Sequence, residues 1–547
     1  MQILPAHGLG GFLLAAPFIS LLLLRSQSEL TSWRRSLPQQ GLHFVPTMGA
    51  LHGGHLQLIR RAAMPRYWGQ PQVLVSVFVN PLQFGAGEDF QHYPRRLEED
   101  GRLACDAGAH AVFAPSAEEM YPRGEAGITH VVPPAFLLKS LCAAQRPGHF
   151  EGVSTVVTRL LGLVRPERIF LGEKDWQQLV ILRQVVTDLG LPVAIEGMAT
   201  VRQQDGLALS SRNSYLTPEE LARASGLFAA LAKAATLAQD RNAPSTILKT
   251  LEEELQRCNL PPEYVALVDA HTLGSRQTNG GLALLAAAVR CGPARLIDHR
   301  FLMPRAPIVA IDGPAGAGKS TVTRALAERL GLTFLDTGAM YRALTWWVLQ
   351  QGVDPADPRA VAPLLEGLAL DLRPSGEGQV QIKVNGHDVS TAIRSPEVTA
   401  VVSTVAAHAC VRQSLTTLQQ RLGELGGLVA EGRDTGTAVF PHAECKIFLT
   451  ASVAERARRR ARDMQKQGFE APELEELERQ IAERDRKDST RKEAPLQQAP
   501  DALLLVTDGM EIEAVIQAMV DAFRSKVPEE AWPGSGPETG QPSPAPA

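Results

Sequence analysis

No CxxC pair occurs in this sequence, and its six cysteines are scattered between Cys105 and Cys445. That absence argues against a zinc ribbon, a thioredoxin-type site and a disulfide scaffold, and it favours reduced thiols in the cytosol. Aromatic residues are scarce at 5%, so the core is expected to consist mainly of leucine, valine, isoleucine and alanine. The formal net charge is only −4, which argues against a general nucleic-acid coat and against strong binding to an acidic membrane surface.

No internal repeat is visible. Charged residues (21%) and apolar residues (44%) are present in the proportions of a folded soluble protein. A chain of 547 residues is too long for one hydrophobic core. We therefore expect several domains, roughly three or four.

The two ends differ in composition from the rest of the chain. Residues 8–24 are uncharged and strongly apolar, as in a signal-peptide core or a short membrane anchor. No basic stretch precedes this run, no small-residue cleavage site follows it, and Pro17 interrupts it. For residues 1–23 we therefore favour a start codon assigned too far upstream or a disordered leader, and we expect no membrane association. Residues 528–547 are rich in Pro, Gly, Ser and Glu, which predicts a disordered tail.

Between these ends, short apolar runs alternate with amphipathic stretches, a pattern typical of parallel α/β sheets. A boundary is indicated near residues 303–307, directly before the apolar run PIVAID. The sequence thus predicts a first α/β unit at 24–302, made of a nucleotide-binding lobe (24–204) and a smaller lobe (205–302). A second α/β unit is predicted at 306–527.

The second unit contains GPAGAGKS at 313–320, which fits the P-loop pattern in full. The motif follows a predicted strand and opens a predicted helix, so that backbone N–H groups and the helix N-terminus face a phosphate. Lys319 would reach the β and γ phosphates of ATP and act in catalysis, and Ser320 would reach an Mg²⁺ ion bound to those phosphates. The ATP-binding residues expected here are Gly313, Gly316, Gly318, Lys319, Ser320 and Thr321.

Three further polar clusters follow the P-loop: DTGAMYR at 336–342, GRD at 432–434 and ERDRKDSTR at 483–491. Each arginine cluster alone is more often a solvated, salt-bridged surface. Together in one P-loop unit they indicate an acceptor that carries its own phosphate, because such a group needs several arginines. The basic stretch at 455–464 would either bind RNA or close as a lid over ATP, and the acidic overall balance favours the lid.

With these motifs, residues 306–526 resemble bacterial cytidylate kinases. The resemblance lies in IDGPAGAGKST, LDTGAMYR, EGRDTGTAVFP and ERDRKDSTR. It implies a P-loop nucleoside-monophosphate kinase fold and the phosphorylation of CMP or dCMP by ATP. The implied CMP-binding residues are Ser403, Arg412 and Asp434 at the base, Arg484 and Asp488 at the sugar, and Thr337, Arg342, Arg433 and Arg491 at the phosphate.

The first unit has two histidines three residues apart in PTMGALHGGH at 46–55, at a predicted strand-to-helix turn. No third metal ligand accompanies them, and among glycines the pair is more typical of a phosphate site. An ordinary glycine-rich turn with surface histidines is the alternative. Three polar loops at later strand ends favour the phosphate site: FVNPLQFGAGEDFQHYPR (78–95), LGEKDWQQL (171–179) and DGLALSSRNSYL (205–216).

On these motifs, the chain from about residue 24 to 299 is similar to pantothenate synthetases, and HxGH and LSSR resemble two signatures of nucleotidyltransferases. The resemblance implies a Rossmann-like fold and a two-step reaction. The carboxylate of pantoate attacks the α-phosphate of ATP, which gives pantoyl adenylate and pyrophosphate, and the amine of β-alanine then displaces AMP.

The same resemblance implies the site residues of the first unit. The implied catalytic residues are His52, His55, Lys174, Ser210, Ser211 and Arg212, with His55 as the proton donor. The implied ATP site adds Met48, Gly49, Ala50, Leu51, Gly53, Gly54, Gly172, Glu173, Asp175, Val201 and Leu209. Pantoate would be held by Met48, Gln83 and Gln178, with Gln83 also near β-alanine.

The leading hypothesis is one cytosolic chain with two independent active sites that use ATP and Mg²⁺. As in the family it resembles, the first unit would form a homodimer. A second hypothesis keeps the kinase and makes the first unit a different adenylating ligase. A third makes the chain a membrane-anchored or nucleic-acid-binding module with residual motifs, which the intact catalytic sets argue against.

Overall fold

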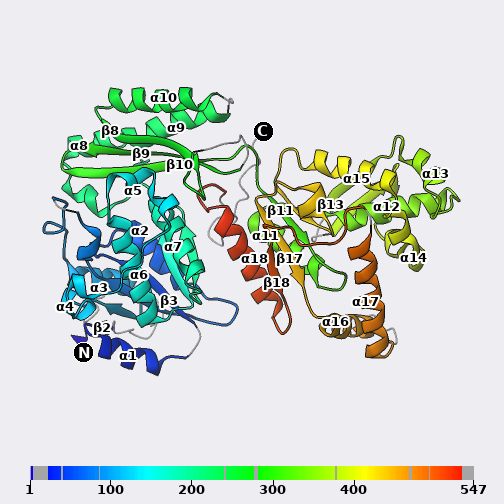
Figure 1. Cartoon of the computed structure of the whole chain (residues 1–547), viewed down its shortest axis with the longest axis horizontal. Coiled ribbons are helices and arrows are strands. Elements are labelled where there is room, and N and C mark those ends of the chain that lie inside the picture. Colours follow the sequence, from blue (N-terminus) through cyan, green and yellow to red (C-terminus); the bar gives the residue numbers. More distant parts are fainter. Residues whose placement is uncertain are drawn as a thin grey trace, which may run out of the picture. The chain divides into compact units, whose positions relative to one another are not determined.

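The computed structural model describes residues 2–3, 22–38, 41–85, 87–239, 242–275, 281–375, 379–466, 471–491 and 493–532 (Figure 1). The chain divides into two compact units. Unit 1 consists of Met1–Pro304 and Pro528–Ala531, and unit 2 begins at Arg305, runs to Val527 and resumes at Trp532. Each unit has its own sheets and hydrophobic core.

In the described residues, unit 1 is built around a seven-stranded sheet with the order β1-β2-β5-β4-β3-β6-β7. Neighbouring strands are parallel except for β1 and β2. The strands are β1 (Gln2–Ile3), β2 (Leu22–Leu24), β3 (Leu42–Thr47), β4 (Gln72–Val77), β5 (Ala111–Phe113), β6 (Arg168–Gly172) and β7 (Ala194–Met198). The helices are α1 (Gln27–Ser36), α2 (Gly53–Ala62), α3 (Leu97–Asp106), α4 (Ala117–Met120), α5 (Leu141–Gln145), α6 (His149–Val164) and α7 (Trp176–Asp188).

Both faces of this sheet are covered. Two successive residues of β3, Phe44 and Val45, belong to different hydrophobic clusters, as the two-residue period of a strand requires. One cluster packs α6 and α7 against the sheet, and the other packs α2 and α3 against it. A parallel sheet covered on both faces leaves its carboxyl edge, with the loops after the strands, as the place for a ligand.

The second lobe of unit 1 is an antiparallel sheet with the order β10-β9-β8. Its strands are β8 (Pro262–Asp269), β9 (Ala283–Cys291) and β10 (Ala294–Leu302), and its helices are α8 (Pro218–Ala224), α9 (Gly226–Gln239) and α10 (Pro244–Arg257). Leu285 of β9 packs into the core beneath these helices, whereas Leu284 packs into the cluster of the first lobe. The central strand β9 therefore contributes to both cores.

One helical stretch in the described residues, Pro218–Ala238, is long and apolar enough to cross a membrane by composition alone. It is formed by α8 and α9, and its Leu227 and Leu231 are buried in the core of the second lobe. Other positions of the stretch are not buried, since 28% of its apolar window is buried.

Unit 2 contains a five-stranded parallel sheet with the order β12-β16-β11-β17-β18 and an antiparallel sheet with the order β13-β14-β15. The strands are β11 (Ile308–Asp312), β12 (Thr333–Asp336), β13 (Leu370–Ser375), β14 (Gln379–Val384), β15 (His387–Asp388), β16 (Leu428–Glu431), β17 (Cys445–Thr450) and β18 (Leu503–Val506). The helices are α11 (Lys319–Leu330), α12 (Thr337–Gln350), α13 (Pro358–Val361), α14 (Pro396–Val405), α15 (Ala409–Leu422), α16 (Val453–Lys466), α17 (Leu474–Thr490) and α18 (Ile512–Lys526). The two parallel sheets confirm the predicted α/β class of both units.

The ends of the chain differ from expectation where they are described. Leu22–Leu24, at the end of the apolar run, forms β2 and pairs with β5, whereas residues 4–21 of the predicted leader lie outside the described residues. The predicted tail is corrected at its start, because Pro528–Ala531 packs into unit 1, where Arg202 neutralises Glu530. The composition of the tail could not show that Arg202 pairs with Glu530. Residues 533–547 lie outside the described part.

Candidate active sites

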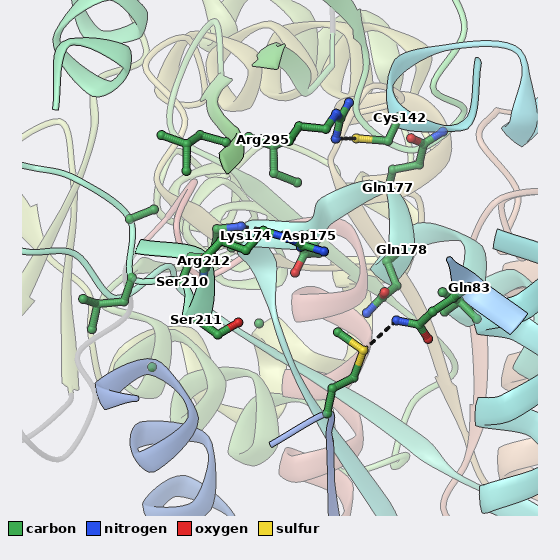
Figure 2. A pocket seen from close by; sticks show the side chains of 18 of the residues that line it. Gln83, Cys142, Lys174, Asp175, Gln177, Gln178, Ser210, Ser211, Arg212 and Arg295 are labelled. Atoms are coloured by element: carbon green, nitrogen blue, oxygen red, sulfur yellow. Dashed lines mark hydrogen bonds and ion pairs between the residues drawn. The ribbon is translucent and has the colours of Figure 1, made fainter. Parts of the chain in front are cut away.

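Unit 1 contains a cavity of about 900 Å³ between the carboxyl edge of the parallel sheet and the second lobe (Figure 2). Most residues predicted for the ligase site line this cavity. They are Met48, His52, Gly54, His55, Gln83, Gly172, Lys174, Asp175, Gln178, Val201, Leu209, Ser210, Ser211 and Arg212. In Figure 2, Lys174, Ser211 and Arg212 lie on one side, and Gln83 and Gln178 on the other. The cavity thus has a cationic, hydroxyl-bearing side and an amide-bearing side.

The two histidines open helix α2 and cap its first turn. Nδ1 of His52 accepts the N–H of Gly54 (3.2 Å), and Nδ1 of His55 accepts the N–H of His52 (3.3 Å). Burial is the main cause that lowers the pKa of His52 to about 4 and that of His55 to about 3. Both rings are therefore neutral at pH 7, and because Nδ1 accepts, the proton sits on Nε2. Each ring can donate this Nε2–H to a phosphate oxygen at the positive end of the helix.

The cationic side of the cavity is ordered by paired side chains. Arg212 donates from Nε and Nη2 to the two carboxylate oxygens of Asp89, both at 2.9 Å. Ser211 Oγ lies 3.1 Å from the hydroxyl of Tyr93, and Lys174 Nζ lies 3.7 Å from the carboxylate of Asp175. A forked pair with a carboxylate fixes the plane of a guanidinium, so Arg212 is oriented before any anion arrives.

The amide side is ordered by Asn80. Its Nδ2 donates to Gln83 Oε1 (3.2 Å), and its Oδ1 accepts from the hydroxyl of Tyr121 (2.8 Å). Gln83 in turn donates to the sulfur of Met48 (2.8 Å), and its backbone carbonyl lies 2.8 Å from Nδ1 of His149. Gln83 is therefore held at three points, which suits a residue that orients a small polar substrate.

Five residues predicted for the ATP site do not line the cavity. Leu51 is packed in the core beneath α2. Ala50 and Leu51 donate their N–H groups to the carboxylate of Asp100 at 3.0 and 2.8 Å. The carboxylate of Glu173 accepts N–H groups of Glu529 and Glu530 instead of facing the cavity. The other two are Gly49 and Gly53; a Cβ on Gly49 would meet Asp100 and Val77 at 2.9 Å. Gly49, Ala50, Leu51 and Gly53 therefore form the turn around the two histidines, whereas Glu173 belongs to the loop after β6.

Sequence reasoning missed several lining residues. Tyr93 and Arg146 line the cavity, and so do Asp298 and His299 of the second lobe. Arg146 pairs with Glu88 (2.5 Å). Arg146 lies in the stretch RPGHFEGVSTVV, where the polar residues next to the apolar run were a usable signal. For Asp298 and His299 no local signal exists, since they reach the cavity only through the packing of β10.

In unit 2, the P-loop follows β11 and opens α11, as predicted. Lys319 Nζ folds back onto the carbonyls of Gly313 and Pro314, both at 2.9 Å. Gly316 and Gly318 have φ of +76° and +85°, values that favour glycine. Thr321 is exposed. The loop has the backbone that surrounds a phosphate.

Gly313 has a φ of +152°, and a Cβ there would lie 1.9 Å from the carbonyl oxygen of Leu449. We expect Gly313→Ala to destabilise unit 2 by about 3 kcal/mol or more, from overlap with backbone added to strain. Gly331→Ala is the matched control, because Gly331 has a φ of +65° and open space around it, so that only about 1–2 kcal/mol of strain applies. Thermal unfolding of the two variants measures the difference; equal destabilisation would contradict the steric argument.

Ser320 and Glu431 fit a bound Mg²⁺. Ser320 Oγ donates to Glu431 Oε1 at 2.9 Å. The other oxygen, Oε2, is buried and has no hydrogen-bond partner in the part of the chain that the structure describes. A hard cation prefers oxygen ligands and keeps several waters. These two side chains would hold the ion directly or through water, and the ion would neutralise charge on the phosphates.

Three arginines predicted for the acceptor gather beyond the P-loop. Arg433 donates to the carbonyl of Gly313 (3.1 Å) and pairs with Asp488 (3.2 Å). Arg342 donates to Thr399 Oγ1 (3.0 Å). Burial lowers the pKa of both Arg342 and Arg484, and Arg433 lowers each further by repulsion. Cations that crowd one another in this way form a site for a multiply charged anion.

The residues predicted to contact the base lie beside this cluster. Asp434 is buried and pairs with Arg412, and Arg491 Nη2 lies 3.6 Å from its other oxygen. Arg412 stacks on Tyr341, with 5.5 Å from its guanidinium carbon to the ring centroid. Ser403 is exposed on α14, and Thr337 donates to the carbonyl of Glu431 (2.6 Å). The structure therefore joins Arg412, Asp434 and Arg491 in one network, with Tyr341 as a member that sequence reasoning missed.

The arginines of the predicted lid reach the P-loop. Arg456 of α16 donates to the carbonyl of Ala315 (3.2 Å) and pairs with Asp485 (2.5 Å). Arg459 donates to the carbonyl of Ala317 (3.3 Å). These carbonyls belong to the phosphate loop, so the basic helix lies where its arginines can exchange them for phosphate oxygens.

Two family models match the chain. The model of pantoate-beta-alanine ligase matches residues 22–301, and that of cytidylate kinase matches residues 309–525. The chain is 59% identical over 504 residues to the bifunctional pantoate ligase/cytidylate kinase of Prochlorococcus marinus (strain MIT 9313), covering 92% of this chain and 99% of the relative. It is 60% identical over 511 residues to the protein of the same name from Parasynechococcus marenigrum (strain WH8102), covering 93% and 99%.

Among solved structures, the pantothenate synthetase of Thermus thermophilus is 45% identical; the match covers 51% of this chain and 98% of that chain, with a TM-score of 0.48. The two family models match separate units of this chain, and the relatives match over nearly their full length. This chain and its relatives therefore carry the ligase part and the kinase part in the same order. The chain thus belongs to the bifunctional pantoate ligase/cytidylate kinase family.

Proposed function

We propose that unit 1 joins pantoate to β-alanine with ATP, through pantoyl adenylate, and that unit 2 phosphorylates CMP and dCMP with ATP. The observation that supports the first activity is the cavity in which the HxGH turn and the Lys174 loop face the 210–212 segment. The observation that supports the second is the P-loop beside an arginine cluster. Membership of the family supports these substrate classes.

In unit 1, the cationic side would bind the phosphates and the amide side would bind pantoate. Nε2–H groups of His52 and His55, together with Lys174 and Arg212, would stabilise charge that grows on the α-phosphoryl group and on departing pyrophosphate. Gln83 and Gln178 would align the pantoate carboxylate for in-line attack. The neutral state of His55 makes it a hydrogen-bond donor to phosphate, which refines the proton-donor role that the resemblance implied.

In unit 2, the P-loop amides and Lys319 would hold the β and γ phosphates of ATP, with Mg²⁺ near Ser320. Arg342, Arg433 and Arg491, with Thr337, would hold the phosphate of CMP. Arg484 and Asp488 would hold its sugar. The chemistry is then positioning and charge neutralisation between two anions that otherwise repel each other.

Nucleotide product analysis tests both activities on one sample. Purified protein with Mg²⁺ and ATP receives pantoate plus β-alanine in one tube and CMP in the other. AMP with pyrophosphate and pantothenate in the first tube, and ADP with CDP in the second, are the expected products. A silent first tube beside an active second one would contradict the ligase proposal; a panel of other acids and amines then tests for a different adenylating ligase.

Replacing Asp434 should weaken the choice of base. The Arg412–Asp434 pair matches an amine donor and ring acceptors on cytosine, and such a pair contributes about 1–3 kcal/mol of discrimination. We expect D434A to lower kcat/KM for CMP by about 10- to 100-fold and to narrow the preference for CMP over UMP. D434N, which keeps the size of the side chain, is the control for packing. Unchanged CMP-to-UMP ratios in both variants would contradict this role.

We further propose that the protein acts in the cytoplasm, where both reactions find ATP, as a homodimer through unit 1. Size-exclusion chromatography with light scattering measures the mass in solution, and a monomer at micromolar concentration would contradict the dimer.

A further inference from the structure

The four residues after α18 and Val527, Pro528–Ala531, belong to unit 1. Ala531 packs against the main hydrophobic cluster of this unit. The two glutamates of the segment, Glu529 and Glu530, contact two stretches of chain whose other side lines the ligase cavity. These stretches are 173–175, which follows β6, and 199–202, which follows β7.

The first stretch is tied to the segment by Glu173. Its side chain is buried (1% exposed). One carboxylate oxygen accepts the N–H of Glu529 (2.7 Å), and the other accepts the N–H of Glu530 (2.8 Å). The next residue is Lys174, whose side chain lines the cavity. A buried carboxylate needs such donors, so the two amides fix the backbone from which Lys174 extends.

The second stretch is tied to the segment by both glutamate side chains. Glu530 accepts from Thr200 Oγ1 (2.7 Å) and pairs with Arg202 (2.7 Å). Glu529 accepts from the N–H of Ala199 (3.4 Å) and pairs with Arg61 of α2 (3.1 Å). Ala199, Thr200 and Val201 line the cavity. The segment 528–531 therefore contacts, from outside the cavity, both stretches of chain that form the wall on the cationic side.

The charged network around the segment extends into the second lobe. Arg202 also forms a forked pair with Asp298 (2.6 and 3.0 Å), and His299 lies 3.7 Å from Glu530. Asp298 and His299 line the cavity as well. Removal of the Glu530 carboxylate thus changes a network that reaches the cavity from the second lobe.

We infer that Glu529 and Glu530 are positioning residues of the ligase site: the segment 528–531 holds Lys174 and the stretch 199–201 in place for ATP. The inference rests on the proposed ligase function. The ligase unit of this chain is then completed by residues that lie more than two hundred positions after its last strand, β10. The amide side, with Gln83 and Gln178, has no contact with the segment among the interactions of the described residues.

The test compares full-length variants in steady-state assays of both reactions. Glu529→Ala combined with Glu530→Ala keeps the two backbone N–H groups that bind Glu173 but removes the side-chain contacts to Arg61, Ala199, Thr200 and Arg202. We expect this variant to lower ligase kcat/KM for ATP by about 10- to 100-fold, because a displacement of about 1 Å in a site costs up to that much. KM for pantoate should change less than about threefold, since that side is held separately. E530Q keeps one acceptor oxygen and should fall between the wild type and the double variant. CMP phosphorylation should be unchanged.

The matched control is Glu219→Ala combined with Glu252→Ala, which removes the same charge from exposed helix positions of unit 1. The inference would be overturned if kcat/KM for ATP in the Glu529→Ala, Glu530→Ala variant equalled that of this control. An equal rise in KM for ATP and for pantoate would also overturn it, as would an activity loss that only follows a lower unfolding temperature. A wild-type chain that makes no AMP and pyrophosphate would instead defeat the ligase function itself, so the two failures are distinguishable.

Discussion

Replacing His55 with alanine is expected to lower kcat/KM for pantothenate formation by about 10²- to 10³-fold and to leave CMP phosphorylation unchanged. The reason is the fixed tautomer of the ring. Its Nδ1 accepts the N–H of His52, so Nε2–H is the group that would stabilise charge on the phosphates. Pyrophosphate release and CDP formation, measured on the same preparation, check both halves of the expectation.

The pH dependence of the same reaction follows from the lowered pKa values. With pKa values of about 4 for His52 and 3 for His55, both rings stay neutral as pH rises from 6 to 8, since protonation requires a pH below the pKa. Ligase kcat/KM should therefore show no histidine titration in that range. A step near pH 6.5 that H55A removes would show that His55 works as an acid with a normal pKa.

Two further variants, H55Q and His130→Ala, serve as controls for the His55→Ala experiment. H55Q keeps a donor of similar length but cannot cap the turn in the same way, so it should retain only part of the activity. His130 pairs with Glu151 (2.8 Å) and does not line the cavity, so its loss should leave the ligase unchanged. If H55A and His130→Ala lost the same fraction of ligase activity, the loss would result from impaired folding and not from a missing donor in the site.

Local sequence was enough to predict the parts of each site that lie at strand ends. The HxGH turn follows β3 and the Lys174 loop follows β6, and parallel strands bring such loops to one edge. The P-loop was predictable for the same reason. In these motifs, the residues that determine the chemistry lie next in sequence to the strand that determines their place in the fold. The 210–212 segment lies further along the chain after β7.

What the sequence could not predict depends on packing between distant segments. Glu173 belongs to the LGEKD motif, yet its carboxylate binds Glu529 and Glu530, more than 350 positions later. Disorder was predicted for 528–547 because this stretch is rich in Pro, Gly, Ser and Glu. Arg202 and Arg61 supply partners for Glu530 and Glu529 only in the folded unit. Asp298, on β10, reaches the cavity in the same non-local way.

Replacing Lys319 with alanine is expected to lower kcat/KM for CMP phosphorylation by about 10³-fold and to leave pantothenate formation intact. Burial, with Arg433 beside it, lowers the pKa of Lys319, while its Nζ is satisfied by the carbonyls of Gly313 and Pro314. Bound ATP phosphates would favour the charged form of Nζ and would offer it stronger acceptors than carbonyls. The alanine variant lacks the positive charge of Nζ beside the phosphoryl group that would be transferred from ATP to CMP.

The control for charge is Lys487→Ala, because Lys487 is exposed and its pair with Glu483 (2.8 Å) lies on the surface of α17. Surface pairs of this kind contribute little, so CMP kinase constants should stay within about twofold of the wild type. The decisive comparison is the ligase rate of K319A at an unchanged unfolding temperature. If pantothenate formation fell with CDP formation in that variant, the two sites would share a step and the independence of the units would be wrong; if it stayed at the wild-type rate, each unit would be shown to work on its own ATP.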